Sequence, residues 1–327
     1  MNRLCLLVLF LIIHLTMASR GDSSNTFKKC VANCVVEARL KPCELTAAER
    51  LFWWDCPANC RYECMWEVEG IRLKNVTRVH EYARILKEPV DEKKLHSYRP
   101  MKFYGKWVFH RIWGVQELAS SLFSLFNLIP HLIQFLFYYH IFILRGRVGY
   151  VWLVVVAAGA NAWVWSTIFH ARDQTITERL DYFSAGLTIT SMCWATLIDT
   201  IPFFQQTFPF LLTTFLFAFH YLTHIYHLHF VLFDYGYNMN VMIITSLIFI
   251  LLWLIWILRH PERPYRWRVL LIHFSLIAAG LFEVFDFPPY FYLVDAHSLW
   301  HASTVPLYFY WFSILRTHLR FEEKKTR

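Results

Sequence analysis

Charged residues are scarce in this sequence. Asp, Glu, Lys and Arg together make up 17% of its 327 residues, whereas 57% of the residues are hydrophobic and 19% are aromatic. The apolar residues form several runs of about 20, the length needed to cross a bilayer. This composition excludes an ordinary soluble domain and predicts an all-α polytopic membrane protein.

The first apolar run is shorter than the others. Arg3 precedes an apolar stretch from Leu4 to Leu15, and the small residues Ala18 and Ser19 follow it. This pattern is typical of a removable signal peptide, which we expect over residues 1–20. An uncleaved anchor is the alternative, and either one would deliver the next segment outside the cytosol.

Cysteine is rare except in the segment that follows. Residues 21–112 contain six of the eight cysteines, namely Cys30, Cys34, Cys43, Cys56, Cys60 and Cys64. An even number of clustered cysteines behind a signal peptide indicates a small disulfide-rich luminal domain, with the pairing left open. A zinc site is the weaker alternative, because the four-residue spacing lacks the usual two-residue knuckle. The sequon at Asn75 agrees with a luminal location.

The rest of the chain predicts seven transmembrane helices within a domain over residues 113–315. Each span has about the length that a hydrocarbon core requires. The expected spans are 115–143, 149–170, 181–199, 207–226, 238–258, 268–287 and 295–315.

Lys and Arg are nearly absent from one set of loops. If the cysteine-rich domain is luminal, the short luminal loops hold only Arg172 and Arg179, and the cytosolic loops and the tail 316–327 are basic. This asymmetry supports a cytosolic C-terminus. Lys324 and Lys325 resemble a dilysine retrieval signal for the endoplasmic reticulum, although a solvated basic tail explains them equally well.

This topology places scattered polar residues at one depth. Ser166 and His170 lie near the luminal end of the second span, Asp181 starts the third, and His297 and His301 lie in the first turns of the seventh. Residues four apart share a helix face, so the last two can present their imidazoles to one ion. With His170 they form a three-histidine set that leaves a position for water, as in catalytic zinc sites.

Such a set predicts hydrolysis by a zinc-activated water. Three neutral imidazoles leave the charge of Zn²⁺ intact, so the ion can lower the pKa of bound water. Asp181 could then accept the proton of the water, and Ser166 could donate a hydrogen bond to the developing oxyanion.

Other interpretations of these residues remain open. The sequence has 16 histidines, so pairs four apart also arise by chance. His220, His224 and His227 share a second helix face, but no carboxylate is paired with them by spacing. Glu117 is either an interfacial carboxylate or a residue that supports the site. The roles of Glu283 and Asp286 are likewise open, and Cys193 is expected to be a small buried residue.

Several strings together resemble a known family. They are NAWVWSTIFHARD (Asn161–Asp173), ERLDYF (Glu178–Phe183), FDYGYN (Phe233–Asn238), DFPP (Asp286–Pro289), LVDAHSLWH (Leu293–His301) and CPANCRYECMW (Cys56–Trp66). They closely resemble the post-GPI-attachment-to-proteins factor 3 family. That family belongs to the CREST group of seven-helix membrane hydrolases, with alkaline ceramidases and adiponectin/progestin-type receptors.

The resemblance implies more than the spacing does. It implies a phospholipase A2-like ester hydrolase that removes the unsaturated sn-2 acyl chain from the phosphatidylinositol of GPI-anchored proteins. The motif of the group falls on Ser166 and His170, on Asp181, on His297 and His301, and on Glu117 as the acidic residue of the first helix. The implied metal ligands are thus His170, His297 and His301, and the implied catalytic residues are Ser166, Asp181 and Glu117.

The resemblance also defines the partners and the rival functions. GPI-anchored proteins and membrane lipid are the expected partners, no nucleic acid is expected, and the implied location is the Golgi membrane, with cycling through the endoplasmic reticulum. A ceramidase-like amidase, a seven-helix receptor and a non-catalytic GPI- or lipid-binding cofactor are the alternatives. The disulfide-rich domain favours the GPI ester over ceramide, because it suits a substrate that carries glycan or protein.

Overall fold

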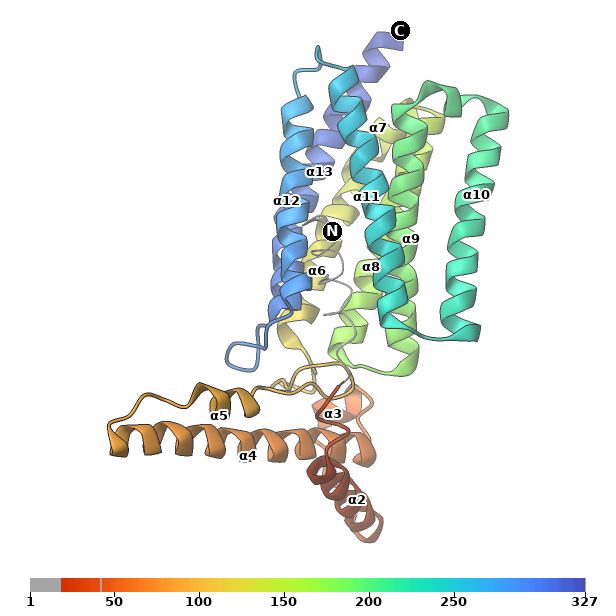
Figure 1. The fold of residues 1–327 in the computed structure, drawn as a ribbon. Helices are drawn as coiled ribbons and strands as arrows, with labels where there is room; N and C mark the ends of the chain where they lie inside the picture. The colour runs from red at the N-terminus through yellow and green to blue at the C-terminus, as the bar shows by residue number, and fades with distance from the viewer. Residues whose placement is uncertain (1–18, 42, 327) are drawn as a thin grey trace. The chain divides into compact units, whose positions relative to one another are not determined.

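A computed structural model gives the structure of residues 19–41 and 43–326 (Figure 1). The expected signal peptide falls mostly on residues 1–18, outside the described residues, as do the side chains of Lys324 and Lys325. The described chain divides into two compact units. The cysteine-rich unit extends to Leu118 and includes the loop Phe287–Asp295, and the helical unit contains Ala119–Asp286 and the chain from Ala296 onward.

Among the described residues, the cysteine-rich unit contains four helices, each of which begins at a polar N-cap. A side-chain oxygen of each cap accepts a hydrogen bond from a backbone N–H of the first turn, which would otherwise lack an acceptor. The helices are α2 (Asn25–Leu40), α3 (Ala47–Leu51), α4 (Cys56–Leu86) and α5 (Glu92–Ser97), and their caps are Ser24, Thr46, Asp55 and Asp91.

Three disulfides hold this unit together. Cys30 pairs with Cys64 and Cys34 with Cys60, so two bonds join α2 to α4. The four-residue spacing explains the pairing, because it puts each pair of cysteines on one face of its helix, and antiparallel helices then match first with last. A third bond joins Cys43 to Cys56. The disulfide prediction is therefore confirmed, and the zinc interpretation of these cysteines is wrong, since the sulfurs are bonded to one another.

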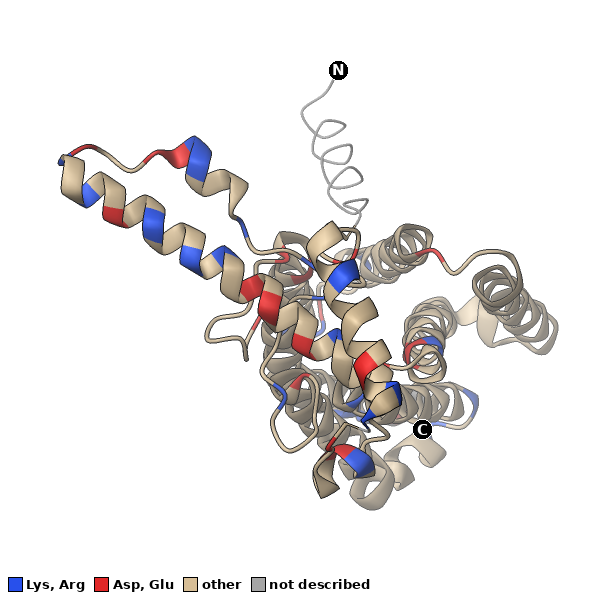
Figure 2. Cartoon of the chain, turned by 90° about the horizontal axis from the view of Figure 1, so that it is seen from below, with Lys and Arg blue, Asp and Glu red and all other residues tan. Residues whose placement is uncertain are grey.

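The apolar core of the cysteine-rich unit is small. Phe27, Val68, Phe103 and Val108 are buried around the disulfide Cys30–Cys64. Charged residues lie along much of α4 and the neighbouring α5 (Figure 2). The sequon Asn75 lies within α4, not on the surface loop that glycosylated sequons usually occupy.

The helical unit has a helix at each of the seven expected apolar segments. The first segment is continuous through α6 (Leu118–Ile133), η1 (Gln134–Tyr138) and α7 (Tyr139–Leu144). The others are α8 (Arg147–Ala171), α9 (Thr175–Thr200), α10 (Thr207–Tyr226) with η3 (His227–Val231), α11 (Tyr235–Arg259), α12 (Arg266–Phe285) and α13 (Ala296–Thr326). A short 3₁₀ segment, η2 (Pro202–Gln205), joins α9 to α10.

Five of these segments in the described chain are long and apolar enough to cross a membrane. They are Leu118–Leu144, Arg147–Ala171, Thr207–Val231, Tyr235–Arg259 and Arg266–Phe285. The helices α9 and α13 are as long but less apolar. In α9 the reason is its position, because it packs against α8, α10 and α11 and buries Ser and Thr side chains among them (Figure 1). The expected count of seven spans therefore remains a prediction for these two helices.

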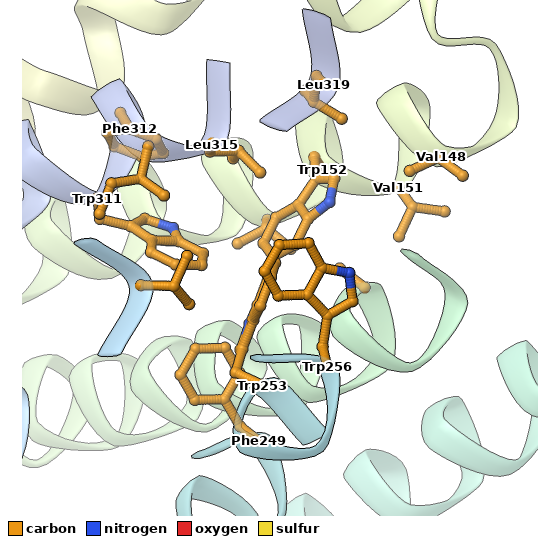
Figure 3. Close-up of a cluster of buried hydrophobic side chains, with 14 of the residues drawn as sticks. Val148, Val151, Trp152, Phe249, Trp253, Trp256, Trp311, Phe312, Leu315 and Leu319 are labelled. Carbon is orange, nitrogen blue, oxygen red and sulfur yellow. The ribbon is translucent and has the colours of Figure 1, made fainter. Parts of the chain in front are cut away.

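The core of the helical unit is rich in tryptophan. The Trp311 ring of α13 packs against Trp152 of α8 and Trp253 of α11, with ring centroids 5.8 and 5.5 Å apart (Figure 3). Beside them the buried Asp199 carboxylate accepts hydrogen bonds from the Trp152 indole at 2.8 Å and from His318 at 3.1 Å. The buried Asp199 carboxylate is thus paired.

Candidate metal centre

Three histidines from two helices converge in the helical unit. His170 lies in the last turn of α8, and His297 and His301 lie in the first turns of α13. The Nε2 atom of His297 is 3.3 Å from Nε2 of His170 and 2.8 Å from Nε2 of His301. One ligand atom from each of the three lies within 4.8 Å of the others. This is the three-histidine set that the sequence predicted.

Burial and an acidic partner orient these rings. His170 and His301 are buried, and His297 is partly exposed. The Nδ1 atom of His297 is 2.7 Å from Oε2 of Glu283, near the end of α12, so its proton sits on Nδ1 and its Nε2 lone pair faces the other two rings. The hydroxyl of Tyr235 donates to the other Glu283 oxygen at 3.3 Å.

The backbone of His301 is fixed by α6. The Asn127 amide donates to the His301 carbonyl at 2.8 Å, and the Trp163 ring packs edge-on against the His301 ring at 5.3 Å. The Nδ1 atom of His301 is buried and has no hydrogen-bond partner among the described residues. The ring is therefore placed by packing and by its backbone.

This donor set fits a zinc ion. A tetrahedral Zn²⁺ with bonds of about 2.1 Å to nitrogen separates its ligand atoms by roughly 3.4 Å. The His297–His170 separation of 3.3 Å is close to that value, the His297–His301 separation of 2.8 Å is shorter, and all three ligand atoms lie within 4.8 Å of one another. A carboxylate bonded to the second nitrogen of a ligand histidine, as Glu283 is to Nδ1 of His297, is common in zinc sites.

Ser166 lies one turn before His170 and is buried. Its hydroxyl is 3.0 Å from the Ser124 hydroxyl, which itself donates to the Ser120 carbonyl at 2.8 Å. Because the Ser124 proton is used in that bond, Ser166 donates to Ser124. The pair joins α8 to α6 next to the three histidines.

The two predicted carboxylates lie in different units. Asp181 is half-buried on α9, six residues after the helix begins, in the helical unit. Glu117 immediately precedes α6 and belongs to the cysteine-rich unit, where it is buried and forms a 2.5 Å ion pair with Lys106. The roles assigned to both residues from the sequence remain predictions.

The second histidine cluster does not converge on a common point. Within the described part of the chain, His170, His297 and His301 are the one group whose ligand atoms meet as a metal site requires. His224 is buried and bonds Asn238 at 3.1 Å, and the His227 ring packs on Tyr237. These contacts are those of packed histidines.

The roles of other residues follow from their contacts. Asp286 ends α12 in a left-handed conformation, with φ at 40°. Cys193 is buried and unpaired, as expected. The sequence leaves the role of Glu283 open, and the structure shows its carboxylate bonded to Nδ1 of His297. Ser124 is a site neighbour that the sequence analysis misses, although its spacing from Ser120 and Ser121 puts all three on one polar face of an apolar helix.

Comparisons with known proteins agree with these observations. Residues 46–319 match the Per1-like family. The chain is 32% identical over 313 residues to the zebrafish protein named GPI-specific phospholipase A2-like PGAP3, covering 94% of this chain and 92% of that protein. It is 34% identical over 324 residues to the Xenopus laevis protein of the same name, covering 95% and 93%.

A fungal protein is similar to this chain as well. The chain is 34% identical over 314 residues to the Schizosaccharomyces pombe Protein PER1 homolog, covering 90% of this chain and 85% of that protein. No solved structure matches the chain. Because the family match covers most of the sequence and the relatives align nearly end to end, this chain belongs to the Per1-like family.

Proposed function

We propose that this chain is a multi-pass membrane hydrolase of GPI-anchor remodelling. It would cleave the sn-2 acyl ester of the phosphatidylinositol in GPI-anchored proteins and release the unsaturated fatty acid. The names of its vertebrate relatives, GPI-specific phospholipase A2-like, support the substrate. The observation that carries the proposal is the convergence of three histidine rings on one point, with the Glu283 carboxylate bonded to Nδ1 of His297.

The three histidines would hold a Zn²⁺ ion. Bound there, the ion would supply Lewis acidity, which polarises an ester carbonyl and lowers the pKa of water. Two contacts of the chain hold these ligands in place. Glu283 holds the proton of His297 on Nδ1, and packing against Trp163 fixes the His301 ring. Preorganised ligands need no rearrangement when the substrate arrives.

Ser166 and Asp181 would handle the charge and the proton of the reaction. The Ser166 hydroxyl, now directed at Ser124, can rotate to donate a hydrogen bond to the oxyanion of the cleaved ester. Asp181 would accept the proton of the attacking water and return it to the leaving alcohol. Glu117 would support the site from the segment before α6.

The position of the site along the helices suits a lipid ester. His170 is one residue from the end of α8, and His297 is the second residue of α13. Groups at the ends of spans lie near the headgroup region, where the sn-2 ester of a phospholipid is found. The freed fatty acid could then leave sideways into the bilayer.

The proposed orientation follows from charge and disulfides. Three disulfides suit an oxidising lumen, and the basic loops suit the cytosol. We therefore place the cysteine-rich unit in the lumen, the C-terminus in the cytosol, and the protein in the Golgi, with cycling through the endoplasmic reticulum.

The acyl composition of GPI anchors tests this function. Cells that lack the endogenous protein are rescued with wild type or with His297→Ala at matched expression, and their anchors are analysed by mass spectrometry. Wild type should replace unsaturated sn-2 chains with saturated ones, and His297→Ala should leave them unsaturated. His220→Ala, an exposed histidine on α10, is the matched control and should rescue as wild type does.

The same experiment separates the rival functions. Rescue by His297→Ala would remove the metal mechanism and favour a non-catalytic GPI-binding cofactor. Failure of wild type to change the anchors, together with an altered ceramide content, would favour a ceramidase-like amidase.

A further inference from the structure

Three tight turns of the cysteine-rich unit carry aromatic residues in a left-handed conformation. They occur at Tyr104, Trp113 and Phe291, with φ of 51°, 51° and 53°. Each turn is closed by an isolated backbone bridge, Phe103 with Lys106, Ile112 with Val115 and Tyr290 with Val294. Glycine and asparagine usually occupy such positions, and a bulky side chain there is an outlier. The backbone thus adopts an unfavourable conformation that places aromatic rings at the turn tips.

Two of these rings are among the most exposed of the apolar side chains. Trp113 is 80% exposed and Phe291 is 88% exposed. Trp53, which follows α3 and also has a positive φ, is 67% exposed. Side chains as exposed as these contribute little packing energy to the unit. We call these three residues the aromatic tips.

Trp53 and Trp113 belong to one rigid surface. The Trp54 indole donates to the Gly114 carbonyl at 2.8 Å, so the turn of Trp113 is bonded to the residue that follows Trp53. A Cβ atom at Gly114 would lie 2.7 Å from the Ala48 carbonyl oxygen of α3, which shows how closely the turn approaches that helix.

Arg111 links the chain just before the Trp113 turn to Trp54 and to α3. Its guanidinium stacks on the Trp54 ring at 4.3 Å and forms a 2.5 Å ion pair with Glu49. The tips are therefore presented by a buried framework and do not hang on a loose loop.

The Phe291 turn is fixed to the same stretch of chain. The His110 backbone N–H donates to the Tyr292 carbonyl at 2.9 Å, and the Tyr292 hydroxyl donates to the buried Glu69 at 2.8 Å. Trp113 follows His110 by three residues, which span roughly 10 Å at most. The Trp113 and Phe291 tips thus lie in the same region of the unit.

The chain tethers these tips to membrane-length helices. Trp113 precedes the start of α6 at Leu118 by five residues, and Phe291 follows the end of α12 at Phe285 by six. Five or six residues reach roughly 20 Å at most. A membrane crossed by α6 and α12 is therefore within reach of both tips, and the tether gives it a high effective concentration there.

We propose that the aromatic tips Trp53, Trp113 and Phe291 embed in the lipid–water interface of the membrane that the helices cross. Tryptophan and other aromatic side chains concentrate at that interface. The occupant of this surface is therefore phospholipid and not a protein partner. The contact would hold the cysteine-rich unit against the leaflet in which a lipid-anchored substrate lies.

Photocrosslinking of the full chain tests this proposal. The photoreactive residue p-benzoylphenylalanine replaces Trp113 or Phe291, which preserves an aromatic ring, and the protein is placed in nanodiscs of phosphatidylcholine and phosphatidylinositol. After irradiation, mass spectrometry should find lipid adducts at both positions. The same residue at Tyr82, which is 66% exposed on α4 and roughly 39 Å along the helix from Cys56, is the control.

The proposal expects a several-fold higher yield of lipid adducts at the tips than at Tyr82. A yield equal to that of Tyr82, or adducts to protein instead of lipid, would overturn it. Because the readout is lipid contact and not hydrolysis, the result is independent of the proposed enzymatic function.

A second variant separates lipid contact from folding. Asparagine tolerates the left-handed conformation, so Trp113→Asn should leave the thermal midpoint of the protein unchanged or raise it. In the same variant the yield of lipid adducts at Phe291 should fall several-fold, because a neighbouring tip no longer enters the interface. An unchanged adduct yield would contradict the proposal.

Discussion

The two units of this protein are stabilised in different ways. The cysteine-rich unit has a small apolar core and three disulfides, whereas the helical unit has one free cysteine, Cys193, and a large core of packed tryptophans. Small domains often need covalent links because their cores bury too little surface. We therefore expect that the cysteine-rich unit can lose stability without loss of the three-histidine site, and that the site can be lost without unfolding either unit.

Within the helical unit, two sets of buried polar residues also differ from each other. Asp199 and His318 form a closed set, since Trp152 and His318 bond the carboxylate and Tyr265 bonds the second His318 nitrogen. The three histidines instead point Nε2 atoms at one another. A closed set of hydrogen bonds is structural, whereas three imidazole nitrogens that meet from two helices suit a shared metal ion.

The largest expected effect is that of His301→Ala. Removal of one of three ligands should abolish both bound zinc and hydrolysis, while the helical circular dichroism stays unchanged. Zinc is measured by mass spectrometry of the purified protein. His224→Ala, another buried histidine, is the control and should keep the metal. Retained zinc in His301→Ala would refute the metal assignment.

Loss of one disulfide should destabilise the cysteine-rich unit and leave the three-histidine site intact. The double variant Cys34→Ala with Cys60→Ala should destabilise the cysteine-rich unit by about 2–5 kcal/mol. Limited proteolysis should then cut between α2 and α4, while the zinc content stays the same. Cys193→Ala is the control and should not expose these sites to protease. Loss of zinc on breaking the disulfide would show that the two units are not independent.

A smaller effect is expected at Glu283. Glu283→Gln keeps the shape but removes the charge that fixes the proton of His297, so zinc affinity should fall about 10- to 100-fold. Competition with a chelator measures the affinity without any assay of activity. Asp286→Asn changes a nearby carboxylate and suits the left-handed backbone there, so it should leave the affinity unchanged. Equal affinity in wild type and Glu283→Gln would show that the contact is incidental.

The smallest effect is expected at Ser124. Ser124→Ala removes the oxygen that accepts the hydrogen bond of Ser166 and so holds that side chain in place. The loss of a hydrogen bond of about 1 kcal/mol corresponds to roughly a fivefold fall in kcat. KM should stay the same. Ser120→Ala is the control, because the Ser120 hydroxyl is buried without a partner among the described residues. An identical kcat in both variants would remove Ser124 from the account.

Much of this architecture could be predicted from the sequence, because it depends on local patterns. Apolar runs located the seven long helices, and the four-residue spacing of His297 and His301 placed both on one face. The disulfide partners could not be chosen from the sequence, because pairing depends on how α2 and α4 pack. Glu283 could not be assigned because its partner lies beyond the loop Phe287–Asp295, and that loop folds with the cysteine-rich unit.

The central claim is tested most directly by the purified full chain in nanodiscs that contain a diacyl GPI anchor with an unsaturated sn-2 chain. Mass spectrometry measures the fatty acid released. The account predicts release of the sn-2 chain, loss of release with a zinc chelator, recovery on addition of Zn²⁺, and no release by His301→Ala. Zinc-loaded wild-type protein that releases no fatty acid, or releases it equally well as His301→Ala, would contradict the claim.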